Sequence, residues 1–270
     1  MLNARRAVGA ADILLITLDT LRWDVAQEGL RSRRTPAIAD LLGEAGWERR
    51  HSPATFTLAA HQAFLAGFLP TPAAPGPHPR LFAARFAGSE TTVDETWVFD
   101  APDLPAGLAA AGYHTLCVGG VGFFNPASPL GTVISGRFAE RHWAPEYSVT
   151  SPVSTERQVA RVLASAAALP PARRLFTLLN VSALHQPNCI FADAAEDSPA
   201  TQLAALAYAD AHLGRLVAGL RRRAPQLLIL TSDHGTAYGE DGYRGHRLAH
   251  PVVWEVPFAA RLLPKEEQAA

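Results

Sequence analysis

Reactive thiols and lysines are scarce in this sequence. Two cysteines, Cys117 and Cys189, occur in 270 residues, and neither belongs to a Cys-x-x-Cys pair or a zinc-finger spacing. A disulfide framework is therefore not expected, and this cysteine usage is typical of a reducing compartment. Lys265 is the sole lysine. Arginine thus supplies nearly all the positive charge, which indicates a bias of composition more than a function.

Net charge and long apolar runs are also lacking. The formal net charge is −1 and the pI is about 6.8, so the composition indicates neither a nucleic-acid partner nor an anionic membrane surface. The apolar run ILLITL near the N-terminus is too short for a signal peptide and leads directly into Asp19. No run approaches the length that crosses a bilayer. We expect a soluble, cytoplasmic protein without a membrane anchor, and no pattern indicates its oligomeric state.

Apolar runs alternate with amphipathic segments along the chain. Hydrophobic residues make up 48% of it, enough to bury the core of one large domain. Nearly continuous apolar runs, typical of parallel strands covered on both faces, lie at 12–18, 114–119, 174–181 and 226–231. Helices are predicted at 36–45, 58–66, 103–111, 154–168 and 200–222. The alternation predicts an α/β fold with three layers: a doubly wound, mainly parallel sheet with helices on both faces.

Two segments, 70–100 and 121–152, are rich in proline, glycine, serine and threonine. This composition is typical of long loops or insertions. We expect them to shape the substrate pocket, and neither contains a motif that names the substrate.

Acidic residues and a histidine follow two of the predicted strands directly. Asp19 comes after strand 12–18, and Asp233 and His234 come after strand 226–231. The carboxyl ends of the strands line the binding crevice of an open α/β sheet, so these side chains are expected to converge. An aspartate after a strand is usually a turn or cap residue. Two such strand ends, one of them reading Asp-His-Gly, favour instead a site for a divalent cation such as Mn, Mg, Ca or Zn.

A threonine stands at the predicted start of helix 58–66. Thr57 occupies the N-cap position there, a common structural role for threonine. A hydroxyl at a helix N-terminus also faces free N–H groups and the positive end of the helix dipole, which together form an anion site. Beside a metal ion, such a hydroxyl can lose its proton and attack phosphorus or sulfur. Thr55, two residues earlier, is the competing hydroxyl.

Helix 200–222 carries one carboxylate on its apolar stripe. Asp210 lies four residues after Leu206 and three before Leu213. A carboxylate on a buried face needs a partner, and we interpret Asp210 as the acceptor of a structural hydrogen bond from a nearby loop.

Together these segments resemble a known family, the sulfatase-like branch of the alkaline phosphatase superfamily. The resemblance covers residues 11–259 and rests on the order and spacing of DILLITLDTLRWD, RTPAIADLLGEAGW, SPATFTLAAHQAFLAGFLP, LPAGLAAAGYHTLCVGG, YADAHLGRLVAGL, LLILTSDHGTAYGEDGYRGH and EVPF. It implies a single catalytic domain over 1–270 and one bound divalent ion held by four groups: Asp19, Thr57, Asp233 and His234. His61 matches a histidine four residues after the nucleophile that is implied to contact the substrate.

Departures from the sulfatase pattern narrow the implied activity. The Cys-x-Pro-Ser-Arg motif that sulfatases convert to formylglycine is missing, and Asp19 is followed by Thr20 where sulfatases usually have a second aspartate. A threonine nucleophile belongs instead to phosphodiesterase, phosphoethanolamine transferase and lipoteichoic acid synthase relatives. Two-metal relatives carry Asp-x-x-x-His in mid-chain, where this chain reads Asn180 and His185. The sequence ends soon after VPFAARLLP, so the small C-terminal subdomain of sulfatases is expected to be missing.

The resemblance and the residues together imply a metal-dependent hydrolase that cleaves a small anionic phosphate or phosphonate ester, with a diester favoured. Thr57 is the expected nucleophile, and His185 and His246 are expected to bind the substrate anion or to protonate the leaving group. Asn180 is a further substrate-binding candidate. Arg22 either contacts the phosphate or caps the first helix. His250, four residues after His246, is a weaker metal candidate because Pro251 disfavours a helix there.

Two other functions are compatible with the sequence. A mutase or group transferase of the same superfamily would move the phosphoryl group to an acceptor other than water. A non-catalytic accessory protein would keep the fold and lack a metal ligand, and all four ligand positions are filled here.

Overall fold

The computed structural model describes residues 2–67, 82–84, 97–99 and 103–266. Its main sheet has seven strands in the order β2-β11-β8-β1-β7-β5-β6. The strands β8, β1, β7, β5 and β6 are parallel, and β11 runs antiparallel to both β8 and β2. The strand bounds are β1 Asp12–Leu18, β2 Glu48–His51, β5 His114–Gly119, β6 Glu140–His142, β7 Leu175–Val181, β8 Gln226–Thr231 and β11 Glu255–Leu263.

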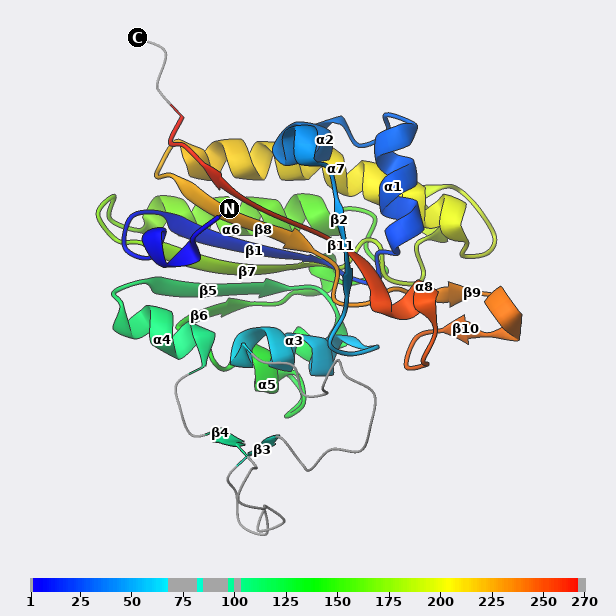
Figure 1. Ribbon diagram of the computed structural model, residues 1–270, viewed down its shortest axis with the longest axis horizontal. Coiled ribbons are helices and arrows are strands. Elements are labelled where there is room, and N and C mark those ends of the chain that lie inside the picture. Colours follow the sequence, from blue (N-terminus) through cyan, green and yellow to red (C-terminus); the bar gives the residue numbers. More distant parts are fainter. Residues whose placement is uncertain (1, 68–81, 85–96, 100–102, 267–270) are drawn as a thin grey trace.

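Helices cover both faces of this sheet (Figure 1). One face carries α1 (Trp23–Arg31), α2 (Pro36–Leu42), α6 (Ser154–Ala168) and α7 (Pro199–Arg221). The other face carries α3 (Thr57–Ala66), α4 (Leu104–Ala110) and α5 (Thr132–Ser135). The expected three-layer, doubly wound, mainly parallel α/β fold is therefore confirmed. No helix in the described ranges combines the length and apolar character that a membrane span requires.

The side chains of β1 show why this strand is apolar throughout. Leu14, Ile16 and Leu18 pack in one buried cluster with α1, α2, α6 and α7. Ile13 and Leu15 pack in a second cluster with α3, α4 and α5. Successive side chains of a strand point to opposite faces, so a central strand between two helical layers buries both sets.

Most predicted elements coincide with observed ones. The four predicted strands correspond to β1, β5, β7 and β8, and only the start of β7 differs, by one residue. The predicted helix 36–45 is interrupted, because Gly43 adopts a φ of +60° and ends α2 before a short 3₁₀ turn at Gly43–Ala45. Helix α3 begins at Thr57 and α7 spans Pro199–Arg221, each close to its predicted range.

Several elements were not predicted. Helix α1 is one, and β2, β6 and β11 are others. All four residues of β2 are exposed, so this charged edge strand has no apolar alternation to reveal it. The segment 121–152 contains α5, β6 and two 3₁₀ turns, at Gly122–Phe124 and Pro145–Tyr147, among its loops. Much of the segment 70–100 lies outside the described residues, which include there only the parallel pair β3 (Phe82–Ala84) and β4 (Trp97–Phe99).

A small hairpin lies beyond the carboxyl ends of the parallel strands (Figure 1). Its strands are β9 (Ala237–Tyr238) and β10 (Arg244–Gly245), joined by a 3₁₀ turn at Glu240–Gly242. Helix α8 (Pro251–Trp254) then leads into β11. The hairpin and α8 are formed by residues that follow His234, and they lie beside the ends of β1 and β8.

Candidate functional site

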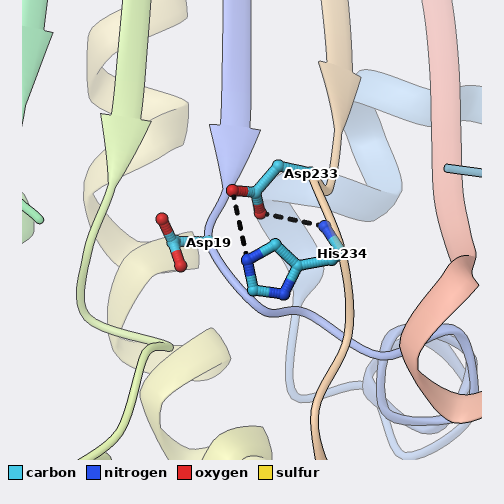
Figure 2. A group of neighbouring side chains, drawn as sticks. All are labelled: Asp19, Asp233 and His234. Atoms are coloured by element: carbon cyan, nitrogen blue, oxygen red, sulfur yellow. Dashed lines mark hydrogen bonds and ion pairs between the residues drawn. The ribbon is translucent and has the colours of Figure 1, made fainter. Parts of the chain in front are cut away.

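Three neighbouring strands end at the candidate site. β1 lies between β7 and β8, and Asp19 follows β1 while Asp233 and His234 follow β8. One oxygen of each carboxylate and one ring nitrogen of His234 lie within 4.8 Å of one another. Figure 2 shows the three side chains grouped just beyond the strand ends. The two strand ends that the sequence singled out therefore converge.

The carboxylates of this group are buried and incompletely hydrogen-bonded. Asp19 and Asp233 are both fully buried, and Asp19 Oδ1 and Asp233 Oδ2 have no hydrogen-bond partner in the described part of the chain. Burial, with a further contribution from the charge of Asp233, raises the pKa of Asp19 to about 6. Burial also raises the pKa of Asp233 to about 7. Unpartnered buried carboxylates need a compensating cation, so these donors fit a divalent metal ion.

The nearby imidazoles do not supply that positive charge. His234 Nε2 and His61 Nδ1 lie 3.6 and 3.8 Å from Asp233 Oδ2. Burial lowers the pKa of His234, and it lowers the pKa of His61 to about 4, so both rings are neutral near pH 7. His234 Nδ1 donates to the carbonyl oxygen of Gly235 at 2.8 Å. This bond leaves the Nε2 lone pair free for a metal ion.

The glycine of Asp-His-Gly is required by packing. A Cβ atom at Gly235 would lie 2.0 Å from the carbonyl oxygen of Val252. The Gly235 N–H donates to the carbonyl oxygen of Val253 at 2.7 Å. The close approach of these two backbones fixes the loop that carries Asp233 and His234 against α8.

Thr57 faces the same group from α3. It is the first residue of that helix, and Phe56 is the N-cap, so the predicted N-cap position of Thr57 is wrong by one residue. Its side chain therefore does not cap the helix. Thr57 Oγ1 lies 3.4 Å from Asp19 Oδ2 and 3.3 Å from His234 Nε2, and Thr57 is buried. The hydroxyl is positioned for metal binding at the positive end of the helix dipole.

A buried chain of hydrogen bonds connects Asp19 to α3. Asn180 Nδ2 donates to Asp19 Oδ2 at 2.9 Å and lies 3.3 Å from Thr17 Oγ1. Thr17 Oγ1 is 3.0 Å from His61 Nε2, and His61 Nδ1 is 2.8 Å from the carbonyl oxygen of Thr57. Donation from Nδ1 to that carbonyl leaves Nε2 as the acceptor for the Thr17 hydroxyl.

This network gives Asn180 and His61 structural roles, and their contact with a substrate stays a prediction. Asn180 and His61 were expected to contact the substrate, but both are fully buried. Both nitrogens of His61 have partners within the protein, and the Asn180 amide group donates to Asp19. They hold Asp19 and Thr57 in place, and Asn180 Oδ1 is buried without a partner among the described residues.

His185 and His246 lie beside the metal-ligand group. The His246 ring centroid is 4.6 Å from that of His234 and 5.5 Å from that of His185. His185 Nδ1 is 2.6 Å from the carbonyl oxygen of Gln186, so Nε2 is the nitrogen without this bond. His246 Nδ1 is buried without a partner among the described residues. Burial, followed by the charges of His234, His185 and Arg247, lowers the pKa of His246 to about 3.

Arg22 does not cap the first helix through its side chain, which was one of its two alternative predicted roles. Its side chain makes no cap hydrogen bond to α1, although it stands at the N-cap position. Instead, its guanidinium donates to Asp24 at 2.9 and 2.6 Å and forms an ion pair with Glu240. Arg22 thus ties the start of α1 to the turn between β9 and β10, and substrate contact by Arg22 stays a prediction.

Two other polar residues have structural roles. His250 Nε2 pairs with Asp241 Oδ2 at 3.1 Å, and His250 Nδ1 accepts from the N–H of Val252. Contrary to expectation, Pro251 begins helix α8, since a proline at the first helical position removes no hydrogen bond. Asp210 accepts from the N–H groups of Ala37 and Ile38 at 3.1 and 2.6 Å. The structural role expected for Asp210 is confirmed, and its partner is the start of α2.

Sequence reasoning missed the residues that hold the Asp19 turn. Thr20 adopts a left-handed φ of +62°, and its N–H donates to Asp233 Oδ1 at 3.2 Å. Gln202 Nε2 donates to the carbonyl oxygen of Thr20 at 2.9 Å, and Gln202 Oε1 accepts from the N–H of Arg22 at 3.2 Å. Gln202 precedes Asp210 by eight residues on the same face of α7. A second polar residue on the same apolar stripe could have been identified from the sequence as a buried hydrogen-bonding group.

Fold and candidate site share one arrangement: residues that could hold a divalent metal ion lie at the carboxyl ends of central parallel strands, and a hydroxyl lies at a helix N-terminus. The sulfatase family model matches residues 11–259. The chain therefore belongs to the sulfatase family. A search of curated proteins finds no match.

Solved structures with a similar fold come from several bacteria. The C-terminal periplasmic domain of EcEptC from Escherichia coli, in complex with Zn, gives a TM-score of 0.65 at 13% identity, covering 95% of this chain and 74% of that one. The soluble domain of lipooligosaccharide phosphoethanolamine transferase A from Neisseria meningitidis gives 0.62 at 15%, covering 94% and 78%. An alkaline phosphatase superfamily protein from Vibrio parahaemolyticus gives 0.54 at 14%, covering 95% and 62%. At these identities the likeness shows the fold alone.

Proposed function

We propose that this protein cleaves a phosphate or phosphonate ester, with Thr57 as the nucleophile and water as the final acceptor. The observation that carries the proposal is the position of Thr57 Oγ1, 3.4 Å from Asp19 Oδ2 and 3.3 Å from His234 Nε2. The same hydroxyl stands at the N-terminus of α3, where the helix dipole favours a bound anion. Neither cysteine follows a strand at this site, since Cys117 is buried within β5 and Cys189 begins a 3₁₀ turn.

Each group has a defined part in the reaction. A bound divalent ion would lower the pKa of the Thr57 hydroxyl and neutralise charge on the ester oxygens. Thr57 Oγ1 forms a bond to phosphorus as the bond to the leaving oxygen breaks. Water then attacks the phosphothreonine, which releases the phosphorus product and restores the hydroxyl.

The two histidines beside the metal ligands have different tasks. His246 has a pKa of about 3 because it is buried near other imidazoles and Arg247, so it is neutral and contacts a substrate oxygen through a ring N–H. His185 keeps its ring oriented by the bond to the carbonyl oxygen of Gln186. We assign protonation of the leaving oxygen to His185.

One metal ion is the expected content. In the ranges that the structure describes, Asp19, Asp233 and His234 are the only three acidic, cysteine or histidine residues whose ligand atoms cluster within 4.8 Å. Asn180 donates to Asp19 through its amide nitrogen, and a neutral amide is a poor substitute for the carboxylate that a second metal ion would need. One ion compensates less negative charge than two, which favours a singly charged diester or phosphonate monoester over a doubly charged phosphate monoester.

Group transfer is the second candidate function. The fold is similar to that of a phosphoethanolamine transferase from Neisseria meningitidis. In this case an alcohol acceptor, in place of water, would attack the phosphothreonine. Product analysis of a diester reaction, with and without added alcohols, separates the two functions. Free phosphomonoester supports hydrolysis, and an exchanged diester supports transfer.

Variants at Thr57 test the nucleophile. Thr57→Ala is expected to abolish turnover of a diester in the presence of Mn or Zn, and Thr57→Ser should keep part of it. Thr55→Ala serves as the matched control and should have a mild effect. Rapid quenching and mass spectrometry of the wild type should find the phosphoryl group, with the retained arm of the diester still attached, on the peptide that contains Thr57. An inactive Thr55→Ala together with an active Thr57→Ala would assign the reaction to the other hydroxyl.

A further inference from the structure

Arg247 has an unusual backbone conformation beside the candidate site. It follows His246 and adopts a left-handed φ of +68°, which costs a residue with a Cβ about 1 kcal/mol or more. Its N–H donates to the carbonyl oxygen of Thr55 at 2.9 Å. This bond fixes the loop after β10 to the segment that leads into α3 and Thr57.

The guanidinium of Arg247 lies over an aromatic ring. Its central carbon is 5.7 Å from the centroid of Phe56, the residue before Thr57. Phe123 extends the aromatic surface, with its ring centroid 6.3 Å from that of Phe56. A cation above an aromatic face is held in position without a loss of its charge.

That charge is not neutralised by the rest of the described chain. Arg247 is exposed and makes no ion pair or side-chain hydrogen bond with any described residue, whereas Arg22 is paired with both Asp24 and Glu240. Arg247 lies next to the site, because it directly follows His246, whose ring centroid is 4.6 Å from that of His234.

These positions separate Arg247 from the reacting atoms. Under the proposed function the phosphorus binds at Thr57 Oγ1, which lies 3.3 Å from His234 Nε2, whereas Arg247 lies over the preceding residue, Phe56. A planar substituent of a bound ester would cover the aromatic surface. An anionic group on that substituent would meet the guanidinium, which binds carboxylate and phosphate through paired donors.

We propose that Phe56 and Arg247 form a recognition site for the organic arm of the ester, and that Arg247 selects arms that carry an anionic group of their own. This inference rests on ester cleavage at Thr57, as proposed above. It adds a substrate class: esters with one negative charge at phosphorus and a second on a planar substituent.

Two diesters with the same leaving group test the selection. 4-Nitrophenyl phenyl phosphate and 4-nitrophenyl 4-carboxyphenyl phosphate both release 4-nitrophenolate and differ by one charge on the retained arm. The wild type is expected to have the higher kcat/KM for the carboxylated ester. In Arg247→Gln the ratio of the two kcat/KM values should fall on the order of tenfold, the size of a lost charge-assisted hydrogen bond. Arg247→Lys should retain part of the preference.

Two further variants separate recognition from folding. Arg247→Gly removes the strain of the left-handed backbone, so it should keep or raise the Tm while it abolishes the preference. Arg244→Ala, which removes an exposed arginine of the same hairpin, should leave the ratio unchanged. An equal ratio in the wild type and Arg247→Gln would overturn the proposal, as would an Arg247→Gly protein that keeps the preference.

Failure of the recognition site can be distinguished from failure of the proposed ester cleavage. If the wild type cleaves neither diester, ester cleavage is wrong, and calorimetric binding of 4-carboxyphenyl phosphate and phenyl phosphate to the metal-loaded protein then decides the role of Arg247. Tighter binding of the carboxylated compound by the wild type, lost in Arg247→Gln, supports the recognition site. Equal binding by both proteins contradicts it.

Discussion

The two ends of strand β1 each place an aspartate in the interior, and the two carboxylates differ in their partners. Asp12, at the start of β1, accepts from Arg174 at 3.3 Å, from the N–H of Leu175 at 3.0 Å and from Arg223 at 3.1 Å. Asp19, directly after the strand, receives hydrogen bonds on Oδ2 only, and its Oδ1 has no partner in the described chain. The two residues are 1% and 0% exposed, so burial does not distinguish them.

Compensation of charge is what distinguishes the two ends. Two arginines neutralise Asp12 within the protein, whereas Asp19 has a second carboxylate, Asp233, as its charged neighbour, and its pKa is raised to about 6. At the start of the strand, ion pairs with the two arginines compensate the charge of Asp12, which is a structural role. The Asp19 end, here called the incomplete end, needs a cation to compensate its charge, and uncompensated buried charge is typical of a functional site.

Removing a ligand at the incomplete end should abolish activity. Asp233→Asn is expected to lose the bound divalent ion and to reduce turnover to the uncatalysed background, because a neutral amide cannot balance the charge of the ion. Metal content is measured by elemental analysis of the purified protein, together with diester turnover before and after chelation. Asp12→Asn is the matched control and should keep the ion. Full activity of a metal-free protein would contradict the metal assignment.

The two histidines of the incomplete end should affect turnover without removing the ion. We expect His185→Ala to lower kcat on the order of 10²–10⁴-fold, as for a lost general acid. His246→Ala should cost less, on the order of 10-fold or more, since it loses a hydrogen bond to a charged substrate. His250→Ala, with its partner Asp241 outside the site, should be mild. A second ion per chain that disappears in His185→Ala would indicate a two-metal phosphomonoesterase or mutase.

Breaking the ion pairs of Asp12 should lower the stability of the folded protein. Asp12→Asn leaves Arg174 and Arg223 without their shared carboxylate, and we expect the free energy of unfolding to fall by about 2–4 kcal/mol. Urea denaturation at neutral pH measures this change. The kcat of the folded variant should stay near that of the wild type. An unchanged midpoint of denaturation would show that the ion pair contributes nothing to stability.

Replacing Asp19 with a neutral residue should stabilise the metal-free protein, which is the opposite of the effect expected for Asp12→Asn. The folded pKa of Asp19 is above the ordinary value of 3.8, so the folded state holds the proton more tightly than the unfolded state. Stability of the metal-free wild type should therefore fall as the pH rises from about 4 to about 7. Asp19→Asn should lessen that decline and be about 1–2 kcal/mol more stable than the metal-free wild type near pH 8. Thermal denaturation with chelator across this pH range measures both effects, and a less stable Asp19→Asn near pH 8 would contradict them.

The fold could be predicted because its central elements are encoded locally. β1, β5, β7 and β8 are continuous apolar runs, and their bounds were predicted to within one residue. The edge strand β2 was missed because its sequence, Glu-Arg-Arg-His, has no apolar periodicity, and pairing with β11 alone makes it a strand. Edge strands depend on a partner distant in sequence, which no local pattern records.

The site could be predicted only in part, because some of its contacts also depend on partners distant in sequence. Asp19, Asp233 and His234 stand directly after strands, a position that sequence periodicity reveals. The burial of His61 and Asn180 was not readable, because their partners, Thr17 and the carbonyl oxygen of Thr57, belong to other elements.

Short-range periodicity and position were enough to predict the four central parallel strands, most of the covering helices, the residues at the strand ends and the hydroxyl at the start of α3. Tertiary structure alone decided which charges are neutralised: Asp12 by two arginines, Arg22 by Asp24 and Glu240, and Asp19 by no cation of the described chain. Charge compensation acts over a few ångströms of space between residues up to 218 positions apart. It therefore emerges only when the chain is folded.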